Sequence, residues 1–407
     1  MEGGPVPRSF GFLGTYPPTV CGLASFSHSL MRGLSTPDSG DTCGIVRVMD
    51  TPVASSATEV AGHLHVGGRD SHDAAAAVLN TFDVAVVQHE YGIYGGKDGD
   101  QLLAVLDRVR VPVIVVAHTV LEAATVHQAQ VLRDVVAASN AVVTMTDAAK
   151  SRLVRGYDVA PDKVSVIRHG ANPRLSLTVP RPGNRPMILT WGLLGPGKGI
   201  EWAVDGLDRL RDLQPTPEYV VAGQTHPRVR LHHGEGYRSA VAERAQRVGV
   251  GHMLRFVGTY LDETALTQLV SRADVVLLPY DSREQVTSGV LVEAVAAGKP
   301  VVATAFPHAV ELLGGGVGLL VPQFDGPSIG CAVHRVLTEP GLARQMAAGA
   351  ARLAPSLLWP AVAEQYRSLA DTLTTARPRT TDRPRMVAGP PAVPSTARLT
   401  DRAPVPR

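Results

Sequence analysis

Short runs rich in Val, Ile and Leu alternate with helical patterns along most of this 407-residue chain, and this alternation limits the fold more than any other feature. A parallel strand buried on both faces reads as a continuous apolar run and needs a crossover, usually a helix, before the next one. The sequence therefore predicts an α/β protein whose parallel sheets carry helices on both faces. The expected strands are Ser9–Leu13, Val84–Gln88, Val113–Ala117, Ala141–Met145, Val164–Ile167, Met187–Thr190, Tyr219–Ala222, Leu254–Phe256, Val275–Leu278 and Val301–Thr304. The expected helices include Ala24–Leu34, Gly99–Arg108, Ala124–Ala138 and Glu201–Leu213.

A Pro-rich segment without helical period, residues 172–186, separates these strands into two sets. The chain is long enough to bury two cores, so we expect two doubly wound, Rossmann-like domains at 1–171 and 187–355. They should face each other across a cleft, because ligands of such sheets bind at the carboxyl ends of the strands. A further helix is predicted at 356–373, and the basic, Pro- and Arg-rich tail 374–407 is expected to be disordered.

The overall charge and the cysteines narrow the class of protein. The formal net charge is only +2, so we expect no nucleic-acid partner. Three widely spaced cysteines without a Cys-x-x-Cys pair favour a reducing compartment over a disulfide framework or a structural zinc site. With no signal-peptide pattern and no long apolar run, the expectation is a cytoplasmic protein without a transmembrane segment. Seven Arg and two Asp from Thr374 onward leave peripheral contact with a membrane surface open.

The segment Tyr280–Thr304 has the order of elements that an anion site needs. A polar loop leads through the small residues Ser288 and Gly289 into a short helix, and an apolar strand follows. At such a helix start, free backbone N–H groups and the helix dipole favour a bound anion. Glu293 lies about one turn into the helix, from where it could reach hydroxyl groups beyond a phosphate. The segment therefore predicts a site for a diphosphate with an attached sugar.

Gly-rich or Gly-containing loops follow the first expected strand of each domain. Gly22 precedes a helix, so the backbone there can approach a ligand closely. In the second domain, the segment WGLLGPGKGIE surrounds a single cation, Lys198, with four glycines. Its spacing differs from that of a P-loop, yet such a turn can cradle a diphosphate while Lys198 offsets the charge of a leaving group. Both loops are therefore predicted to face the cleft.

Two histidines and a glutamate stand at the carboxyl ends of neighbouring strands. His118 directly follows one strand, and His89-Glu90 occupies the same place after the preceding strand. Residues at these positions point toward the cleft of an α/β sheet. His89 and Glu90 could act as base and acid, or they could only orient the loop and an acceptor. Asp98 and Asp100 form a D-x-D pair. We interpret these aspartates as helix-capping residues in preference to metal ligands.

Together these motifs resemble those of the retaining family 4 glycosyltransferases, which have the GT-B fold. That family carries two glutamates around the helix start; Glu293 matches the second, and Gln285 stands where the first is expected. The loop with Gly192 and Lys198 resembles the family's Gly-rich turn. His118 matches the histidine that lies beside the donor sugar in the family.

The resemblance implies a reaction. A sugar would pass from a UDP-, GDP- or ADP-sugar to a hydroxyl group of an acceptor sugar, lipid or small molecule, with retention at the anomeric carbon. Lys198 would neutralise the leaving diphosphate and Glu293 would bind the ribose, while His118 and Gln285 would orient the donor sugar. No cofactor and no metal ion are expected, and the last helix would cross back to the first domain. The residues assigned to donor binding are Gly22, Gly192, Gly223, Ser288, Gly289, Val290 and Leu291, and those assigned to the acceptor side are His89 and Glu90.

Departures from the family pattern keep other functions open. Gln285 in place of Glu, and Leu193 in place of a common Arg, are compatible with a non-catalytic protein that binds a nucleotide-sugar. A GT-B sugar-nucleotide epimerase would need carboxylate pairs in the first domain, where Glu90 is the obvious candidate. A dinucleotide-dependent oxidoreductase is disfavoured, because no G-x-G-x-x-G follows the first expected strand.

Overall fold

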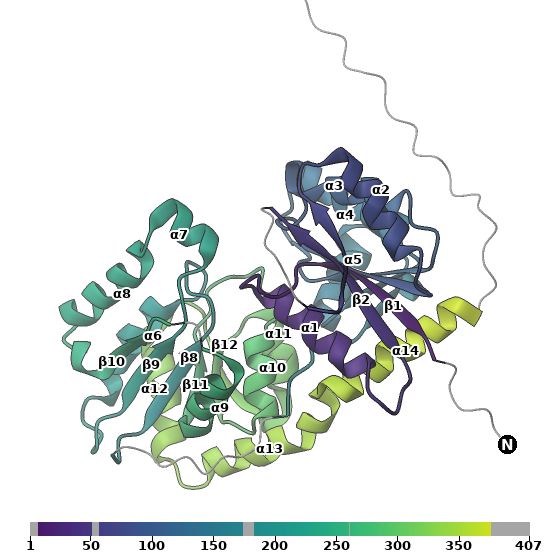
Figure 1. The fold of residues 1–407 in the computed structure, drawn as a ribbon. Coiled ribbons are helices and arrows are strands. Elements are labelled where there is room, and N and C mark those ends of the chain that lie inside the picture. Colours follow the sequence, from purple (N-terminus) through teal and green to yellow (C-terminus); the bar gives the residue numbers. More distant parts are fainter. Residues whose placement is uncertain (1–6, 51–56, 174–182, 260, 376–407) are drawn as a thin grey trace, which may run out of the picture.

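Two parallel sheets form the framework of the molecule (Figure 1). The computed structural model describes residues 7–50, 57–173, 183–259 and 261–375. The first sheet has the strand order β3-β2-β1-β4-β5-β6-β7 and the second has the order β10-β9-β8-β11-β12-β13. All of these strand pairings are parallel. The predicted α/β architecture with two doubly wound sheets is therefore confirmed.

Strands and helices alternate along the chain as the sequence predicts. The strands are β1 Ser9–Gly14, β2 Thr42–Met49, β3 Val60–His65, β4 Val84–His89, β5 Val113–Ala117, β6 Ala141–Thr144, β7 Val164–Val166, β8 Met187–Trp191, β9 Glu218–Ala222, β10 Leu254–Val257, β11 Val275–Leu278, β12 Val301–Thr304 and β13 Gly318–Val321. The α-helices are α1 Gly22–Leu34, α2 Arg69–Leu79, α3 Gln101–Leu106, α4 Val126–Ala138, α5 Asp147–Gly156, α6 Ile200–Gly206, α7 Pro227–His233, α8 Gly236–Arg247, α9 Glu263–Arg272, α10 Gly289–Ala296, α11 Pro307–Leu312, α12 Gly326–Thr338, α13 Leu342–Leu357 and α14 Trp359–Thr375.

The central strands are buried on both faces, which is why their sequences are continuous apolar runs. In β1, Phe10 and Phe12 pack into the cluster that includes α1 and α14, whereas Leu13 packs into the cluster on the opposite face, with α2 and α3. In both sheets the strand order reverses beside the first strand, between β1 and β4 and between β8 and β11. Such a reversal opens a crevice at the carboxyl ends of the strands, and this crevice is where the functional residues are expected.

The last helix, α14, leaves the second domain and packs on the first, as Figure 1 shows for its yellow ribbon. Trp359, Val362 and Tyr366 belong to the same buried cluster as β1 and α1. The backbone of Ala171 joins this crossing, because its N–H donates to Leu357 O at 2.7 Å and its carbonyl accepts from the N–H of Trp359 at 3.1 Å. The predicted crossing helix is thus confirmed.

Three strands were not predicted, namely β2, β3 and β13. Arg47 interrupts the apolar pattern of β2, although its side chain is only 2% exposed. β3 and β13 are edge strands, and both are only partly buried. The predicted linker and tail fall largely on residues 174–182 and 376–407, which lie outside the described residues. No helix in the described part of the chain is long and apolar enough to cross a membrane.

Candidate active site

Helix α10 begins at the carboxyl edge of the second sheet with the geometry of an anion site. Ser288 is its N-cap, and the Ser288 hydroxyl accepts from the N–H of Leu291 at 3.2 Å. The N–H groups of Gly289 and Val290 have no hydrogen-bond partner among the described residues, as expected in a first helical turn. Together with the helix dipole, these groups favour a bound phosphate.

A buried histidine that sequence reasoning missed supports this helix start. His308 on α11 is 1% exposed, and its Nδ1 accepts from the N–H of Ser288 at 2.8 Å. The ring proton is therefore on Nε2, and burial lowers the pKa of His308 to about 3, so the imidazole is neutral. Because the Ser288 N–H is engaged, the backbone donors left for a ligand are those of Gly289 and Val290.

Lys198 lies in the loop between β8 and α6, where the strand order of the second sheet reverses. Its Nζ is 4.2 Å from the ring centroid of Tyr280, in a cation–π contact. Tyr280 is 1% exposed and follows β11, so the contact holds the Lys198 cation beside the loop that leads into α10. Glu293 is half-buried on the second turn of α10.

Three of the four glycines predicted to bind the donor differ in their need for a missing side chain. Gly192 and Gly223 have φ of 119° and 135°, a region that favours glycine. A Cβ on Gly223 would overlap the carbonyl oxygen of Gly192, and a Cβ on Gly192 would lie 3.5 Å from Val290. Gly22 is under no such constraint, because a Cβ there would meet nothing within 4 Å in the described structure. Gly22 therefore borders open space at the start of α1.

His118 stands at the end of β5, and its surroundings keep it neutral. Its Nε2 lies 2.6 Å from Oε1 of Gln88, and its ring contacts the edge of Phe26 at 4.8 Å between centroids. Burial is the main cause that lowers the pKa of His118 to about 3, with a smaller contribution from His169. With the Nε2 proton donated to Gln88, Nδ1 is the acceptor that a substrate hydroxyl can meet.

A second histidine, His169, connects the two domains at this place. A Cβ on Gly289 would come within 2.8 Å of His169 Nε2, so the ring lies against the start of α10. The His169 ring also lies 5.1 Å from Phe26, the residue that His118 contacts. Burial lowers the pKa of His169 to about 4. Figure 1 shows α10 and α11 on the side of the second domain that faces α1, the helix of Phe26.

Glu90 borders a cavity of about 490 Å³ between the first sheet and α7. Thr119 donates its hydroxyl proton to Oε2 of Glu90, and the N–H of Tyr91 donates to Oε1 at 3.1 Å. Burial raises the pKa of Glu90, whereas these hydrogen bonds and nearby Arg228 act in the opposite direction. His89 is 2% exposed, and burial lowers its pKa to about 4. The cavity is lined by Glu90, Tyr91, Gly92, Tyr94, Gly96, Asp98, Thr119, Leu121, Gln128 and Arg228.

Gln285 and the two aspartates of the D-x-D pair contact other protein groups. Gln285 donates from Nε2 to the carbonyl of Thr287, two residues along, so its amide is turned toward its own loop. Asp98 lies 2.9 Å from Nδ1 of His127, and Asp100 lies 3.8 Å from Nε2 of the same ring. The D-x-D carboxylates therefore flank a histidine on α4.

A family model described as Glycosyl transferases group 1 matches residues 177–353, the region that contains Lys198, α10 and Glu293. Over these residues the second domain is similar to the group 1 glycosyl transferases. The match places Lys198 and Glu293 inside a domain type named for sugar transfer, and it ends inside α13, before the crossing helix.

Curated relatives match part of the chain. The chain is 25% identical over 233 residues to alpha-D-kanosaminyltransferase of Streptomyces kanamyceticus, and the matched region covers 54% of this chain and 57% of that protein. It is 28% identical over 243 residues to D-inositol 3-phosphate glycosyltransferase of Corynebacterium diphtheriae, which covers 56% and 55%. The chain thus spans a little over half the length of these relatives.

Solved structures resemble both domains of the chain together. A glycosyltransferase from Rickettsia africae ESF-5 has a TM-score of 0.71 at 14% identity, covering 90% of this chain and 99% of that one. The Anabaena protein Alr3699/HepE in complex with UDP has a TM-score of 0.70 at 17% identity, covering 90% and 100%. At this identity the likeness establishes the fold, which is GT-B.

Proposed function

We propose that this protein is a retaining glycosyltransferase that moves a sugar from a nucleotide-sugar to an acceptor hydroxyl. The observation that supports the proposal is the position of His169, which lies against the start of α10 and on the same Phe26 ring that His118 contacts. Lys198 lies on Tyr280, just before the loop that leads into α10. The free N–H groups of α10 and the Lys198 cation suit a diphosphate, and the neutral His118 suits a sugar hydroxyl. The group 1 family match and the transferase names of the relatives support the same activity.

The proposed reaction breaks the bond between the anomeric carbon and the diphosphate and forms one to the acceptor oxygen on the same face. The departing diphosphate takes the acceptor proton, so the protein mainly stabilises charge and fixes geometry. Lys198 and the first turn of α10 stabilise the leaving group, and Glu293 binds the ribose hydroxyls. His118 orients the donor sugar, and Gln285 joins it after turning from Thr287. The proposal assigns no role to a metal ion or cofactor.

The acceptor is proposed to enter the cavity beside Glu90. Its volume of about 490 Å³ is in the range of small-molecule sites. Glu90, Asp98 and Gln128 offer hydrogen-bonding groups for a polyhydroxylated molecule, and Arg228 closes the cavity from the second domain by donating to the carbonyl of Gly92. Because Arg228 comes from the second domain, its contact with the first domain helps to exclude water from the donor. Excluding water limits hydrolysis of the donor.

Thermal stabilisation by UDP, GDP, ADP and their sugars, each with and without EDTA, tests the donor site. Anabaena HepE was solved with UDP, so UDP and UDP-glucose head the panel. We expect one nucleotide family to raise Tm and EDTA to leave the shift unchanged. A shift that EDTA abolishes would overturn the metal-free proposal, and no shift with any nucleotide would overturn the donor site.

A non-catalytic protein that binds a nucleotide-sugar is the second candidate. The observation that favours it is the Gln285 side chain, an amide in place of a carboxylate, bonded to its own loop at Thr287. The same panel separates the two functions once a ligand is found. A catalyst releases free UDP from UDP-sugar in the presence of an acceptor or, slowly, of water, whereas a binding protein returns the donor intact.

A further inference from the structure

The segment Ser282–Thr287, here called the donor loop, connects β11 to α10 in the second domain but packs against the first domain. Val286 in this loop is 2% exposed and belongs to a cluster otherwise made of first-domain residues. The hydroxyl of Thr146, at the start of α5, donates to the carbonyl of Val286 at 3.0 Å. The first-domain members of the cluster are Tyr91, Ala117, Val120, Leu132, Val136, Val142, Ala149, Leu153, Tyr157, Val159 and Val164.

Glu284, two residues before Val286, forms polar contacts with the first domain. These contacts of Glu284, including its ion pair with Arg152, are here called the tie. Its carboxylate accepts from the N–H of Glu122 at 2.8 Å and the N–H of Ala123 at 3.3 Å. It also forms an ion pair with Nη1 of Arg152 at 2.9 Å, and Nη2 of Arg152 donates to the carbonyl of Arg283 at 3.0 Å. The Arg152 side chain is 14% exposed and that of Glu284 is 36% exposed, so solvent screens this charge-assisted contact in part.

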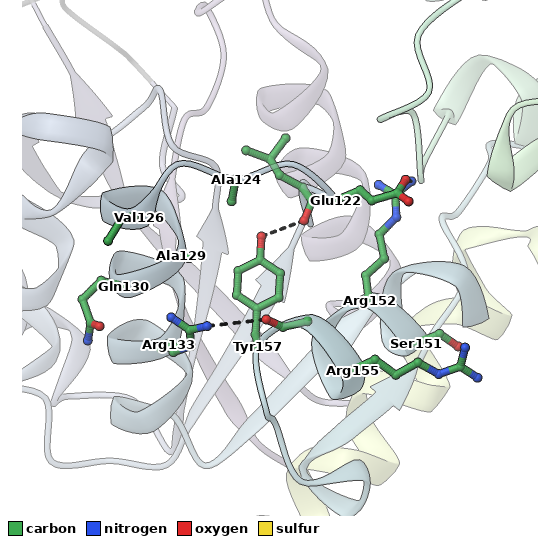
Figure 2. Close-up of a pocket in the computed structure, with 12 residues that line it drawn as sticks. Glu122, Ala124, Val126, Ala129, Gln130, Arg133, Ser151, Arg152, Arg155 and Tyr157 are labelled. Atoms are coloured by element: carbon green, nitrogen blue, oxygen red, sulfur yellow. Dashed lines mark hydrogen bonds and ion pairs between the residues drawn. The ribbon is translucent and has the colours of Figure 1, made fainter.

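The first-domain half of this tie is itself held in place. Figure 2 shows Arg152 beside Glu122, in the wall of a cavity of about 600 Å³ between α4 and α5. Across the same cavity the hydroxyl of Tyr157 donates to the carbonyl of Leu121 at 2.7 Å, which connects the end of α5 to the segment that binds Glu284. Arg152 also donates to the carbonyl of Val120 at 3.0 Å.

We propose that Arg152 and Glu284 are positioning residues that fix the donor loop, and with it the start of α10, against the first domain. The inference rests on the proposed function, because it concerns the geometry between donor and acceptor sites. It also accounts for Glu284, the carboxylate directly before Gln285, which stands where the resemblance predicts a glutamate. Glu284 is engaged with the first domain, and Gln285 is the side chain next to the sugar site.

The tie should affect transfer and not the binding of the nucleotide alone. Lys198, Glu293 and the N–H groups of α10 all belong to the second domain, so they remain in place when the tie is lost. The acceptor cavity lies mostly in the first domain, so its distance from the donor depends on the tie. A contact of this strength corresponds to about tenfold or more in rate when one partner is removed.

The test compares Arg152→Ala and Glu284→Gln with Arg155→Ala. Arg155 lies on the same helix and the same cavity, but it has no ion pair among the described residues. We expect the first two variants to keep the UDP dissociation constant within about threefold and to lose about tenfold or more in turnover. Small-angle scattering of the two variants should show a wider distribution of interdomain distances, and Arg155→Ala should match the wild type in all three measurements.

Guanidinium rescue provides a readout that general destabilisation would not produce. Because Arg152 lines an open cavity, added guanidinium can enter the space that Arg152→Ala leaves and meet Glu284. Low millimolar guanidinium chloride should restore turnover in Arg152→Ala, and it should not do so in the double variant Arg152→Ala/Glu284→Gln. Sodium chloride at the same ionic strength is the control.

Three results would overturn the proposal: unchanged turnover and scattering in both variants, faster turnover, or rescue that does not depend on Glu284. Scattering measures the tie without any substrate, so it separates this inference from the proposed function. If UDP fails to bind the wild type while the variants still widen the interdomain distances, the transferase proposal fails and the structural tie stands. If UDP binds and the distances do not change, the tie fails alone.

Discussion

Gly22 and Gly223 illustrate two reasons for a glycine at a cleft. Gly223 has φ of 135° and would place a Cβ on the carbonyl of Gly192, so the fold itself requires it. Gly22 has room for a methyl group as far as the described structure is concerned. Sequence reasoning assigned both to donor binding, because a glycine after a strand is equally typical of either case. The two cases differ in which atoms a Cβ would meet, and this depends on the folded backbone around each glycine.

We therefore expect opposite effects from the two alanine variants. Gly223→Ala should destabilise the protein by at least about 2 kcal/mol, because it combines a left-handed backbone with a steric overlap. Gly22→Ala should leave the unfolding midpoint in urea unchanged and weaken donor or acceptor binding. Urea unfolding and ligand titration measure the two effects. Equal loss of stability in both variants would contradict the assignment of Gly22 to ligand contact.

Lys198 should act on the diphosphate more than on the nucleoside. Its Nζ is held by the Tyr280 ring beside the loop into α10, where a phosphate would lie. Lys198→Ala should lower turnover by about tenfold or more, the equivalent of a charge-assisted contact of about 1.5–3 kcal/mol. It should weaken UDP binding and leave uridine binding unchanged. Lys97→Ala, at an exposed position in the first domain, is the matched control.

At the scale of elements, the sequence was most informative where a strand is buried on both faces. β5, β11 and β12 have the predicted bounds, because an uninterrupted apolar run leaves no other assignment. β2 was missed because Arg47 breaks its pattern, and nothing local reveals that this arginine is buried. β3 and β13 lie at sheet edges and are only partly buried, so the pattern of a strand buried on both faces does not apply to them.

The crossing helix α14 depends on Trp359, whose place could not be predicted from helical period alone. Its ring is 5% exposed, lies 5.1 Å from Phe26, and fills the space next to Gly170. Trp359→Ala should cost about 3–5 kcal/mol in the free energy of unfolding, through lost burial and the cavity left behind. Trp202→Ala, a half-buried tryptophan on α6, should cost less. Comparable losses in urea unfolding would contradict a special role for α14 in joining the domains.

For the whole molecule, the sequence predicted two domains that face each other but not the contacts between them. Lys198, Glu293 and His118 were predicted as site residues because each belongs to a local motif. His169, His308 and Arg152 were missed as site residues because their roles depend on segments far away in the chain. His308 accepts from Ser288, and Arg152 pairs with Glu284, 132 residues away. The Arg152–Glu284 pair follows from how the two domains face each other, and the His308–Ser288 hydrogen bond follows from packing within the second domain. Local sequence patterns determine neither.

The buried histidines make stability sensitive to acid. Burial lowers the pKa of His89 and His169 to about 4, and of His118 and His308 to about 3. In the unfolded chain each titrates near its ordinary value of about 6.5. Below that pH the unfolded state binds more protons than the native state, so stability falls as pH decreases. This loss should begin near pH 6.5, continue to about pH 3–4, and be absent above pH 6.5.

Urea unfolding at several pH values between 7.5 and 4.5 measures this dependence. Each histidine contributes up to about 1.4 kcal/mol per pH unit inside the window. Glu90 acts in the opposite direction, because its raised pKa makes its contribution largest at low pH and diminishes it as pH rises. His308→Gln keeps an acceptor for the Ser288 N–H and should reduce the slope by about one histidine's share. His232→Gln, at an exposed position on α7, should retain the wild-type slope. An unchanged slope in His308→Gln would mean that this histidine is not held neutral where the two domains meet.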